Sequence, residues 1–450
     1  MTPPKRQLGI TVASAIVVAN MIGAGVFASA GYQAAYSFKD PLTMISTWVI
    51  GGIVALCGAA TYAELGALMP RAGGEYVYLR EAYHPGVGFM SGLMSLFLGF
   101  SAPIAAAALL FAFYLATIVP ALGDPIAIKV VACALIAAMT ALHAFDTKLG
   151  GRVQTGFTIA KVALIFVFVV AGFVVGTGNW SHFASRPDGL SQIGTKAGAA
   201  NYATALMYVG FAYSGWNAAA YIAGEIDKPQ RTLPRALFLG TGLVMLLYIG
   251  LNLVFLYAVP PDAMAVDPDN HPVGDLAARA LFGSSAGGVL SSLIALALMS
   301  TVSAMMMAGP RVYATMAADH ALPPQLAHYS KRGVPSVAVA VQCVIAMLFA
   351  IFSDPDHLLK TVGFMLAIFS ALTVGAVFVF RARGMKSAFR TPLYPITPLV
   401  FLGLSLWTVY FGASAVPGWS GVIAAVLVVG TVVYLVTSKG KARRPIEADE

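Results

Sequence analysis

The chain contains repeated apolar runs that are long enough to cross a lipid bilayer. A bilayer core requires about 20 apolar residues of helix. Twelve runs reach or approach that length, and the ninth is marginal. We therefore predict an all-α membrane protein with twelve transmembrane helices. The runs cover residues 8 to 30, 41 to 69, 86 to 118, 125 to 145, 152 to 176, 199 to 225, 235 to 259, 285 to 317, 334 to 352, 357 to 381, 394 to 414 and 418 to 437.

Charge supports this class of protein and indicates its orientation. Charged residues make up 10% of the chain, against about a quarter in soluble domains. Of the 27 Lys and Arg residues, 20 fall on one side of the predicted membrane and 6 on the other. Basic loops stay in the cytoplasm, so both termini are predicted to be short cytoplasmic tails. The expected location is the plasma membrane, which is the inner membrane in a Gram-negative bacterium.

The net charge of +8 does not indicate nucleic-acid binding. The basic residues lie between apolar spans rather than on a soluble basic patch. The lipid bilayer is therefore a predicted partner, and nucleic acid is not.

Glycines interrupt the first span near its middle. Gly23 and Gly25 flank Ala24, and each glycine costs about 1 kcal/mol in a helix interior. A break in the helix at this depth frees backbone groups, which is tolerated where they line a cavity or bind a ligand. Free N–H groups suit a carboxylate, and free carbonyls suit a cation. Residues 211 to 217 form a second interruption, in the sixth span.

Lys161 is the remaining basic residue, about ten residues into the fifth span. At 1.5 Å per residue it lies about 15 Å deep, near the middle of the bilayer. A lysine at that depth indicates a functional cation, with a purely structural lysine as the alternative. The carbonyls released by the broken first span are its natural partners.

Other residue patterns exclude several classes. The three cysteines lie inside apolar spans, and the seven histidines have no metal-ligand spacing. Neither hydrolase nor phosphate-binding glycine motifs occur. We therefore expect no metal, no cofactor and no enzymatic activity.

Short motifs follow one another in a fixed order along the first ten spans. They are IGAGVF at residues 22 to 27, YAEL at 62 to 65, PRAGGEY at 70 to 76, FAYSGWN at 211 to 217 with EI at 225 to 226 and PQRTLPRA at 229 to 236, and AGPRVY at 308 to 313 with LP at 322 to 323. They resemble motifs of the amino acid-polyamine-organocation (APC) superfamily, and the sixth-span pattern is similar to that of its L-type amino acid transporter (LAT) branch.

The resemblance implies a LeuT-type fold in a single transmembrane domain over residues 1 to 450. Two inverted five-helix repeats would cover about 8 to 176 and 199 to 381, with helices 11 and 12 at about 394 to 437. That the interrupted spans 1 and 6 lie five spans apart agrees with this inversion.

The resemblance also implies a substrate site at the two breaks. The α-carboxylate would bind backbone N–H groups around Ala24 and Gly25, and Lys161 would occupy the position of a sodium ion in sodium-coupled relatives. The α-ammonium would bind carbonyls of the same breaks, Phe211 would act as a gate, and Asn217 would be the polar residue just past the second break. The implied substrate-binding residues are Ile22, Gly23, Ala24, Gly25, Phe211, Ala212, Ser214, Gly215 and Asn217.

Two departures from the family pattern affect substrate and partner. Ala24 replaces a serine and Ser214 replaces a glycine, which favours binding by main-chain groups and a smaller substrate. The loop at residues 119 to 125 lacks the cysteine that heterodimeric animal members use. No disulfide-linked heavy subunit is expected.

These features predict a sodium-independent secondary transporter of small neutral L-amino acids that works by alternating access. Few acidic residues lie in the spans, and Glu64 and Glu225 are placed away from the breaks, pairing with arginines such as Arg71 or Arg235. Exchange and proton-coupled symport both remain open. The alternatives are a carrier of cationic amino acids or polyamines and an amino acid sensor that does not transport.

Overall fold

The computed structural model describes residues 8–71, 73–145, 147–184, 189–266, 272–319, 321–330 and 334–413, with residues 421, 428, 430–432 and 434–435. Within these residues the fold is helical and contains no strand. The one extended pairing found there is an isolated parallel bridge between Leu8 and Ile226. Eight helices in this part of the chain are long and apolar enough to cross a membrane.

The helices follow in this order: α1 (Ile10–Met21), α2 (Ala24–Tyr36), α3 (Pro41–Leu68), α4 (Glu75–Ala82), α5 (Pro85–Met94), η1 (Ser95–Ser101), α6 (Ala102–Ala116), η2 (Pro120–Leu122), α7 (Pro125–Phe145), α8 (Thr147–Val174), η3 (Trp180–Phe183), η4 (Leu190–Gln192), α9 (Lys196–Ala212), α10 (Ala218–Tyr221), η5 (Ala223–Glu225), α11 (Pro229–Ala258), α12 (Pro261–Met264), α13 (Val273–Phe282), α14 (Ser284–Ala318), η6 (Pro324–Ala327), α15 (Ser336–Phe352), α16 (Pro355–Ala382) and α17 (Ile396–Gly412).

Eight of the predicted spans coincide with the long apolar helices, namely the first to fifth, the seventh, the eighth and the tenth. The ninth and eleventh are the shorter apolar helices α15 and α17. The sixth is divided between α9 and α10. Most of the twelfth, at residues 418 to 437, lies outside the described residues. So do several basic residues used for the orientation, including Lys5, Arg6, Lys331 and Arg332.

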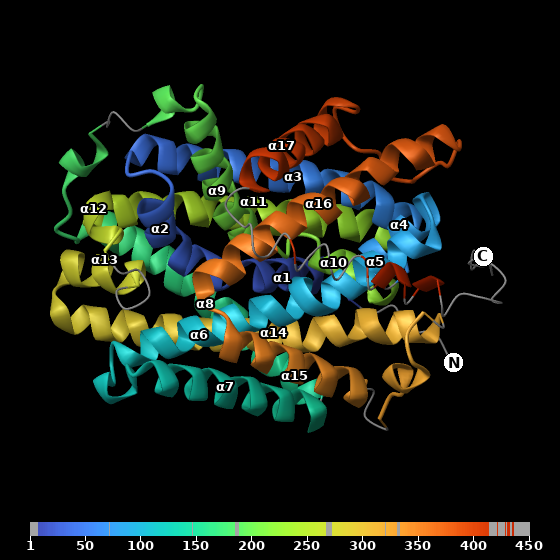
Figure 1. Cartoon of the computed structure of the whole chain (residues 1–450), viewed down its shortest axis with the longest axis horizontal. Helices are drawn as coiled ribbons and strands as arrows, with labels where there is room; N and C mark the ends of the chain where they lie inside the picture. The colour runs from blue at the N-terminus through green and yellow to red at the C-terminus, as the bar shows by residue number, and fades with distance from the viewer. Residues whose placement is uncertain are drawn as a thin grey trace.

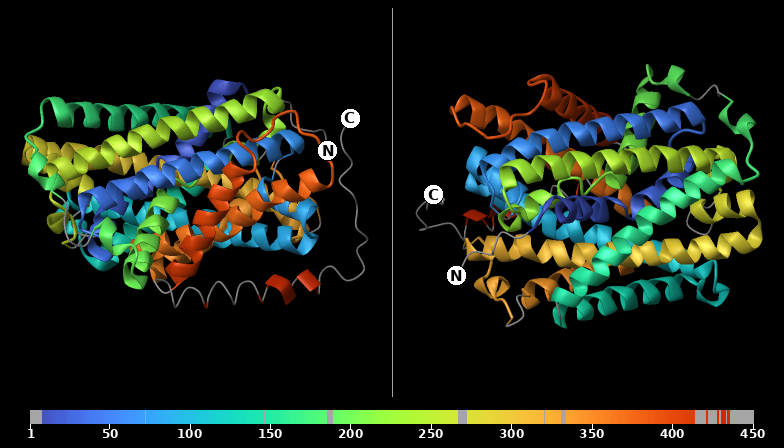
Figure 2. Two further views of the ribbon diagram at one scale, coloured as in Figure 1. Left: turned by 90° about the horizontal axis from the view of Figure 1, so that it is seen from above. Right: turned by 180° about the vertical axis from the view of Figure 1, so that it is seen from behind.

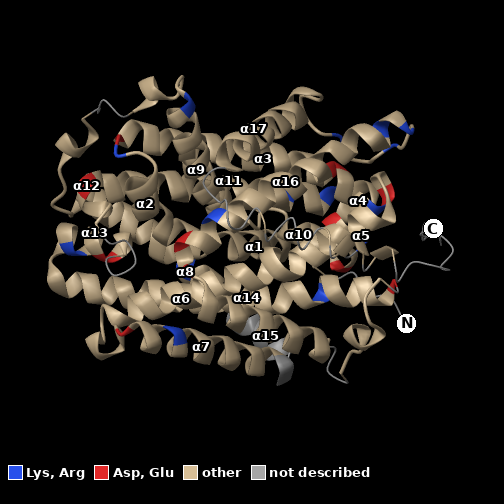
Figure 3. Cartoon of the chain, in the orientation of Figure 1, with Lys and Arg blue, Asp and Glu red and all other residues tan. Residues whose placement is uncertain are grey.

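The long helices run roughly along the longest axis of the molecule (Figure 1). α11 packs against α3 and α1, α14 packs against α6, and α16 packs against α9 and α17. Seen from behind, α8 crosses the bundle obliquely (Figure 2). Most charged residues lie toward the ends of the long helices, which leaves the middle of the molecule largely uncharged (Figure 3).

The first span is broken where the sequence predicted it. α1 ends at Met21 and α2 begins at Ala24, with Gly23 in an extended conformation between them. No side chain caps the start of α2. The first backbone N–H groups of α2 are therefore not satisfied by a side-chain cap, as expected for a site that binds an anion.

The sixth span is also broken, between Ala212 and Ala218. Gly215 has φ +93°, a left-handed conformation that favours glycine. A Cβ on Gly215 would lie 2.8 Å from the carbonyl carbon of Asn20. The glycine thus permits both the turn and the close approach of the second break to the end of α1.

Two local features were not predicted from the sequence. The short helix α4 lies in the connection between the second and third spans, after a turn with Gly73 at φ +119° and Gly74 at φ +51°. The third span contains a π-helical segment, η1, between α5 and α6. π-Helical segments in α-helices are often found near functional sites.

Candidate functional site

The two helix breaks meet around a small cavity of about 10 Å³. That volume holds about one water molecule, so the structure is closed around the breaks. Residues of the third and eighth spans complete the wall of the cavity. Its lining residues are Asn20, Met21, Gly23, Ala24, Gly25, Pro103, Phe211, Ser214, Thr301 and Met305.

Five of the predicted site residues line this cavity, namely Gly23, Ala24, Gly25, Phe211 and Ser214. The other four are not part of its wall. Gly215 and Asn217 line a larger cavity described below. Ile22 and Ala212 are buried, and their carbonyl groups are engaged by other side chains.

Close packing between the broken helices leaves no room for side chains at the glycines. A Cβ on Gly25 would lie 2.3 Å from the Cα of Ala212, and one on Gly23 would lie 2.9 Å from Cγ2 of Thr301. Real Cβ atoms essentially never lie within 3.0 Å of another residue's heavy atom. Both glycines are therefore required for contact between helices as well as for the break.

Lys161 enters the site from α8 and is 1% exposed. Its Nζ atom donates to the carbonyl oxygens of Ala19 at 2.9 Å and Ile22 at 2.7 Å. These are the released carbonyls that the sequence analysis named as its partners. The ammonium group lies at the C-terminal end of α1, where the helix dipole favours positive charge.

Thr301 on α14 reaches the same end of α1. Its Oγ1 atom lies 3.3 Å from the carbonyl oxygen of Ile22 and 3.5 Å from Nζ of Lys161. A carbonyl oxygen has two lone pairs. Lys161 uses one of them, and the single hydroxyl proton of Thr301 is divided between the Ile22 carbonyl and the nearer Ala297 carbonyl, at 3.1 Å.

Tyr248 on α11 joins the two breaks and is fully buried. Its hydroxyl oxygen lies 2.5 Å from the carbonyl oxygen of Met21 and 3.2 Å from that of Ala212. These two carbonyls end the first halves of the two broken helices. The hydroxyl has one proton, which the shorter distance assigns to the Met21 carbonyl, and it lies beside the Ala212 carbonyl at the junction of α1 and α9.

Four residues at the site, Tyr248, Thr301, Pro103 and Met305, were not predicted from the sequence. Each is an ordinary residue of an apolar span, and none belongs to a motif that the sequence analysis recognised. Which face of a span turns toward the breaks depends on how the helices pack. A tyrosine or threonine inside an apolar span needs a hydrogen-bond partner, and this requirement could have pointed to Tyr248 and Thr301.

A second cavity of about 90 Å³ lies beside the sixth-span break. Helices α3, α9, α16 and α17 form its walls. Its surface is mostly apolar, with polar groups from Ser214, Asn217, Ser370, Ser405 and Thr408. Ser214 lines both cavities, so the unwound segment separates one from the other.

Ion pairs join the helix ends on the predicted cytoplasmic side. Asp319, at the end of α14, binds Arg71 at 2.6 Å and Arg80 at 2.8 Å. The hydroxyl of Tyr76 also donates to Asp319, at 3.0 Å. This cluster ties α14 to α4 and to the segment before it.

Glu64 pairs with an arginine, as predicted, but the arginines named for it were wrong. Glu64 forms a bidentate pair with Arg381 of α16, at 2.8 and 2.7 Å, rather than with Arg71 or Arg235. Arg71 instead binds Asp319. The sequence places Arg71 nearer to Glu64 along the chain, but packing brings the last turn of α16 against α3.

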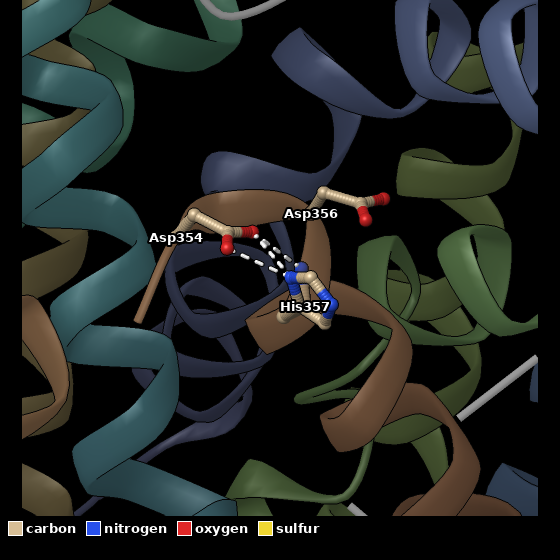
Figure 4. Close-up of side chains that lie close together, drawn as sticks. All are labelled: Asp354, Asp356 and His357. Atoms are coloured by element: carbon tan, nitrogen blue, oxygen red, sulfur yellow. Dashed lines mark hydrogen bonds and ion pairs between the residues drawn. The ribbon is translucent and has the colours of Figure 1, made fainter. Parts of the chain in front are cut away.

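At the opposite end of α16, Asp354, Asp356 and His357 lie close enough together to suggest a metal site (Figure 4). Each has another role in the structure. Asp354 accepts hydrogen bonds from the backbone N–H and Nδ1 of His357 and caps the helix. Asp356 pairs with Lys360 at 2.5 Å and accepts a hydrogen bond from Tyr208. The cluster is thus accounted for as a helix cap and an ion pair.

Together, the fold and the site define a multi-span helical membrane protein with a buried site between two broken helices. The amino acid permease family model matches residues 8–434. The chain therefore belongs to the amino acid permease family, and the resemblance to the APC superfamily is confirmed.

Known transporters are similar to the chain over most of its length. The serine/threonine exchanger SteT of Bacillus subtilis (strain 168) is 31% identical over 408 residues, which is 90% of each chain. The human large neutral amino acids transporter small subunit 2 is 25% identical over 437 residues, covering 96% of this chain and 80% of its own. The mouse b(0,+)-type amino acid transporter 1 is 27% identical over 443 residues, covering 96% and 88% respectively.

Proposed function

We propose that this protein is a sodium-independent secondary transporter that exchanges small neutral L-amino acids across the plasma membrane. The observation that carries the proposal is the ammonium group of Lys161 on the carbonyls of Ala19 and Ile22, at the break in the first span. A fixed cation there replaces a bound metal ion. Two broken helices facing one cavity supply the groups that an amino acid requires.

In this proposal the substrate carboxylate binds the backbone N–H groups at the start of α2, around Ala24 and Gly25. The α-ammonium binds carbonyls near Ile22 at the end of α1 and near Phe211, Ala212 and Ser214 in the sixth-span break. In this conformation Lys161 and Tyr248 engage the carbonyls of Ile22 and Ala212. Phe211 covers the cavity as a gate. Opening of the breaks must enlarge the cavity from about 10 Å³ before an amino acid fits.

A neutral substrate is favoured by the cavity wall. None of its lining residues carries a charged side chain. A cationic amino acid or polyamine would place a second charge there without a partner, which costs free energy. Met305, Pro103 and Ser214 limit the space for a side chain, so a small substrate is favoured. Transport of cationic substrates is the alternative.

The proposed architecture is one domain of twelve spans with two inverted five-helix repeats in a LeuT-type arrangement. Both termini are cytoplasmic, and the protein acts without enzymatic activity and without a disulfide-linked heavy subunit. Residues 119 to 125 contain no cysteine, which supports the absence of a disulfide-linked heavy subunit. Alternating access would move the broken helices against the remaining spans.

Purified protein in proteoliposomes tests the function. We expect uptake of labelled L-serine when the vesicles contain unlabelled L-serine, with equal rates in sodium and choline buffers. Empty vesicles should show little uptake. Uptake into empty vesicles that follows an inward proton gradient would replace exchange with proton symport. Uptake of L-arginine but not L-serine would overturn the neutral substrate.

A further inference from the structure

Glu75 is a buried carboxylate next to the site. It begins α4, outside the long apolar helices, and is 4% exposed. The turn at Gly73 and Gly74 directs it inward, and a Cβ on Gly74 would lie 2.3 Å from the ring of Tyr221. The turn with positive φ angles and this close approach place Glu75 against α10.

Three neutral groups hydrogen-bond to the Glu75 carboxylate. The hydroxyl of Tyr62 donates at 2.5 Å, and Nδ2 of Asn217 donates at 3.2 Å. Ser370 is the third donor. Asn217 is the residue at the start of α10, so the carboxylate holds the second half of the broken sixth span to α4.

No cation pairs with Glu75 among the residues that the structure describes. The groups facing it are tyrosines 62, 78 and 221 from α3, α4 and α10, and Ser370 from α16. Arg80 of α4 is bound by Asp319, and Arg381 of α16 by Glu64. Burial raises the pKa of the Glu75 carboxyl above its ordinary value, although the three hydrogen bonds oppose the shift.

We propose that Glu75 is a proton-binding site that controls the release of α10, and with it the opening of the substrate path toward the cytoplasm. An ionised carboxylate that is buried without a cation depends on its hydrogen-bond donors. Separation of α10 from α4 would remove one of these donors, Asn217. While the carboxylate stays out of water, loss of the Asn217 donor raises its affinity for a proton, so the separated state favours the protonated acid.

Two of the groups that donate to Glu75 also line a cavity that can hold water. Asn217 and Ser370 both hydrogen-bond to Glu75, and both line the cavity of about 90 Å³. That volume accommodates several water molecules. One proton passes from water to a carboxylate oxygen and forms an O–H group, and no other covalent bond changes. The neutral acid is a weaker acceptor for Asn217, so acidification should loosen α10.

The inference rests on the proposed function, and the pH dependence of exchange tests it. In proteoliposomes, the wild-type rate should rise as pH falls, by up to about tenfold per pH unit for one proton. Glu75→Gln mimics the protonated form and should give a rate that does not change with pH. Glu81→Gln is the matched control, because Glu81 lies on the same helix but is partly exposed. If the exchange rate of Glu75→Gln depended on pH as strongly as that of the wild type, the proposal would be overturned.

A second measurement works without transport. Because the folded state raises the pKa of Glu75, it favours the protonated acid. Wild-type thermal stability in detergent should therefore fall, relative to Glu75→Gln, as pH rises from the ordinary carboxyl pKa through the raised one. Parallel stability profiles would overturn proton binding at Glu75. If the wild type showed no exchange, while its thermal stability and that of Glu75→Gln still depended differently on pH, the proposed function would be overturned instead.

Glu75→Asp serves if Glu75→Gln does not fold. It keeps the carboxylate but shortens the side chain by one methylene, so the pH response should persist at a shifted midpoint. An unchanged midpoint would place the titrating group elsewhere.

Discussion

The ammonium nitrogen of Lys161 lies 2.7 Å from the carbonyl oxygen of Ile22, although the two residues are 139 positions apart. This contact places a charged side chain from α8 at the C-terminal end of α1, inside the break of the first span. A helix that ends inside a membrane exposes carbonyl groups that need donors. The chain supplies that donor itself.

Replacement of Lys161 by methionine should stop exchange. The substitution keeps much of the side-chain volume but leaves the carbonyls of Ala19 and Ile22 without the ammonium donor. An unsatisfied buried acceptor costs about 1–3 kcal/mol, so we expect the rate to fall by at least about tenfold. L-serine exchange in proteoliposomes measures the loss.

Lys129→Met provides the matched control. Lys129 also donates to a backbone carbonyl, that of Ile351 at 2.7 Å, but it lies at an exposed position. Its replacement should leave the exchange rate within about twofold. Equal losses in the two variants would show that Lys161 has no special role at the break.

Gly25→Ala should disrupt the site without adding a large side chain. The new methyl group would lie 2.3 Å from the Cα of Ala212, and backbone cannot move aside as a flexible side chain can. Overpacking of this kind costs about 1–3 kcal/mol. We expect a lower melting temperature and loss of L-serine binding. Gly242→Ala in α11, where no atom lies within 4 Å of the new methyl, should be tolerated.

Tyr248→Phe should uncouple the two breaks while preserving the packing of the ring. The carbonyls of Met21 and Ala212 lose a hydroxyl within hydrogen-bond distance, at a cost of about 1–3 kcal/mol. Exchange should slow by about tenfold with little change in folding yield. Tyr202→Phe, whose hydroxyl contacts Ser46 instead, should exchange at nearly the wild-type rate. Normal exchange by Tyr248→Phe would argue against a bridging role.

Asp319→Asn should loosen the contact between α14 and α4. Partly exposed ion pairs contribute about 0.2–1 kcal/mol, and Asp319 makes two. Backbone amides of α4 should exchange hydrogen several times faster in the variant. Asp262→Asn removes an exposed pair with Lys39 and should not change exchange in α4. Unchanged protection of α4 in Asp319→Asn would contradict a role for the cluster in holding these helices together.

Sequence features local to one span predicted much of the site. The glycines identified the break between α1 and α2, and the depth of Lys161 identified its carbonyl partners. What the sequence did not provide is the rotation of each span about its axis, because Ala- and Gly-rich spans have little polar periodicity. The contact of Tyr248 with both breaks and the pairing of Glu64 with Arg381 depend on that rotation.

The isolated bridge between Leu8 and Ile226 has a mechanical consequence. The backbone N–H of Leu8 donates to the carbonyl of Glu225, and the N–H of Asp227 donates to the carbonyl of Leu8, each at 3.0 Å. Leu8 precedes α1, and Ile226 follows η5, the short helix after α10. The two hydrogen bonds therefore join the first half of the broken first span to the end of the sixth span. A movement of α1 must carry α10 with it or break both backbone hydrogen bonds, so we expect the two breaks to open together while the bridge is intact.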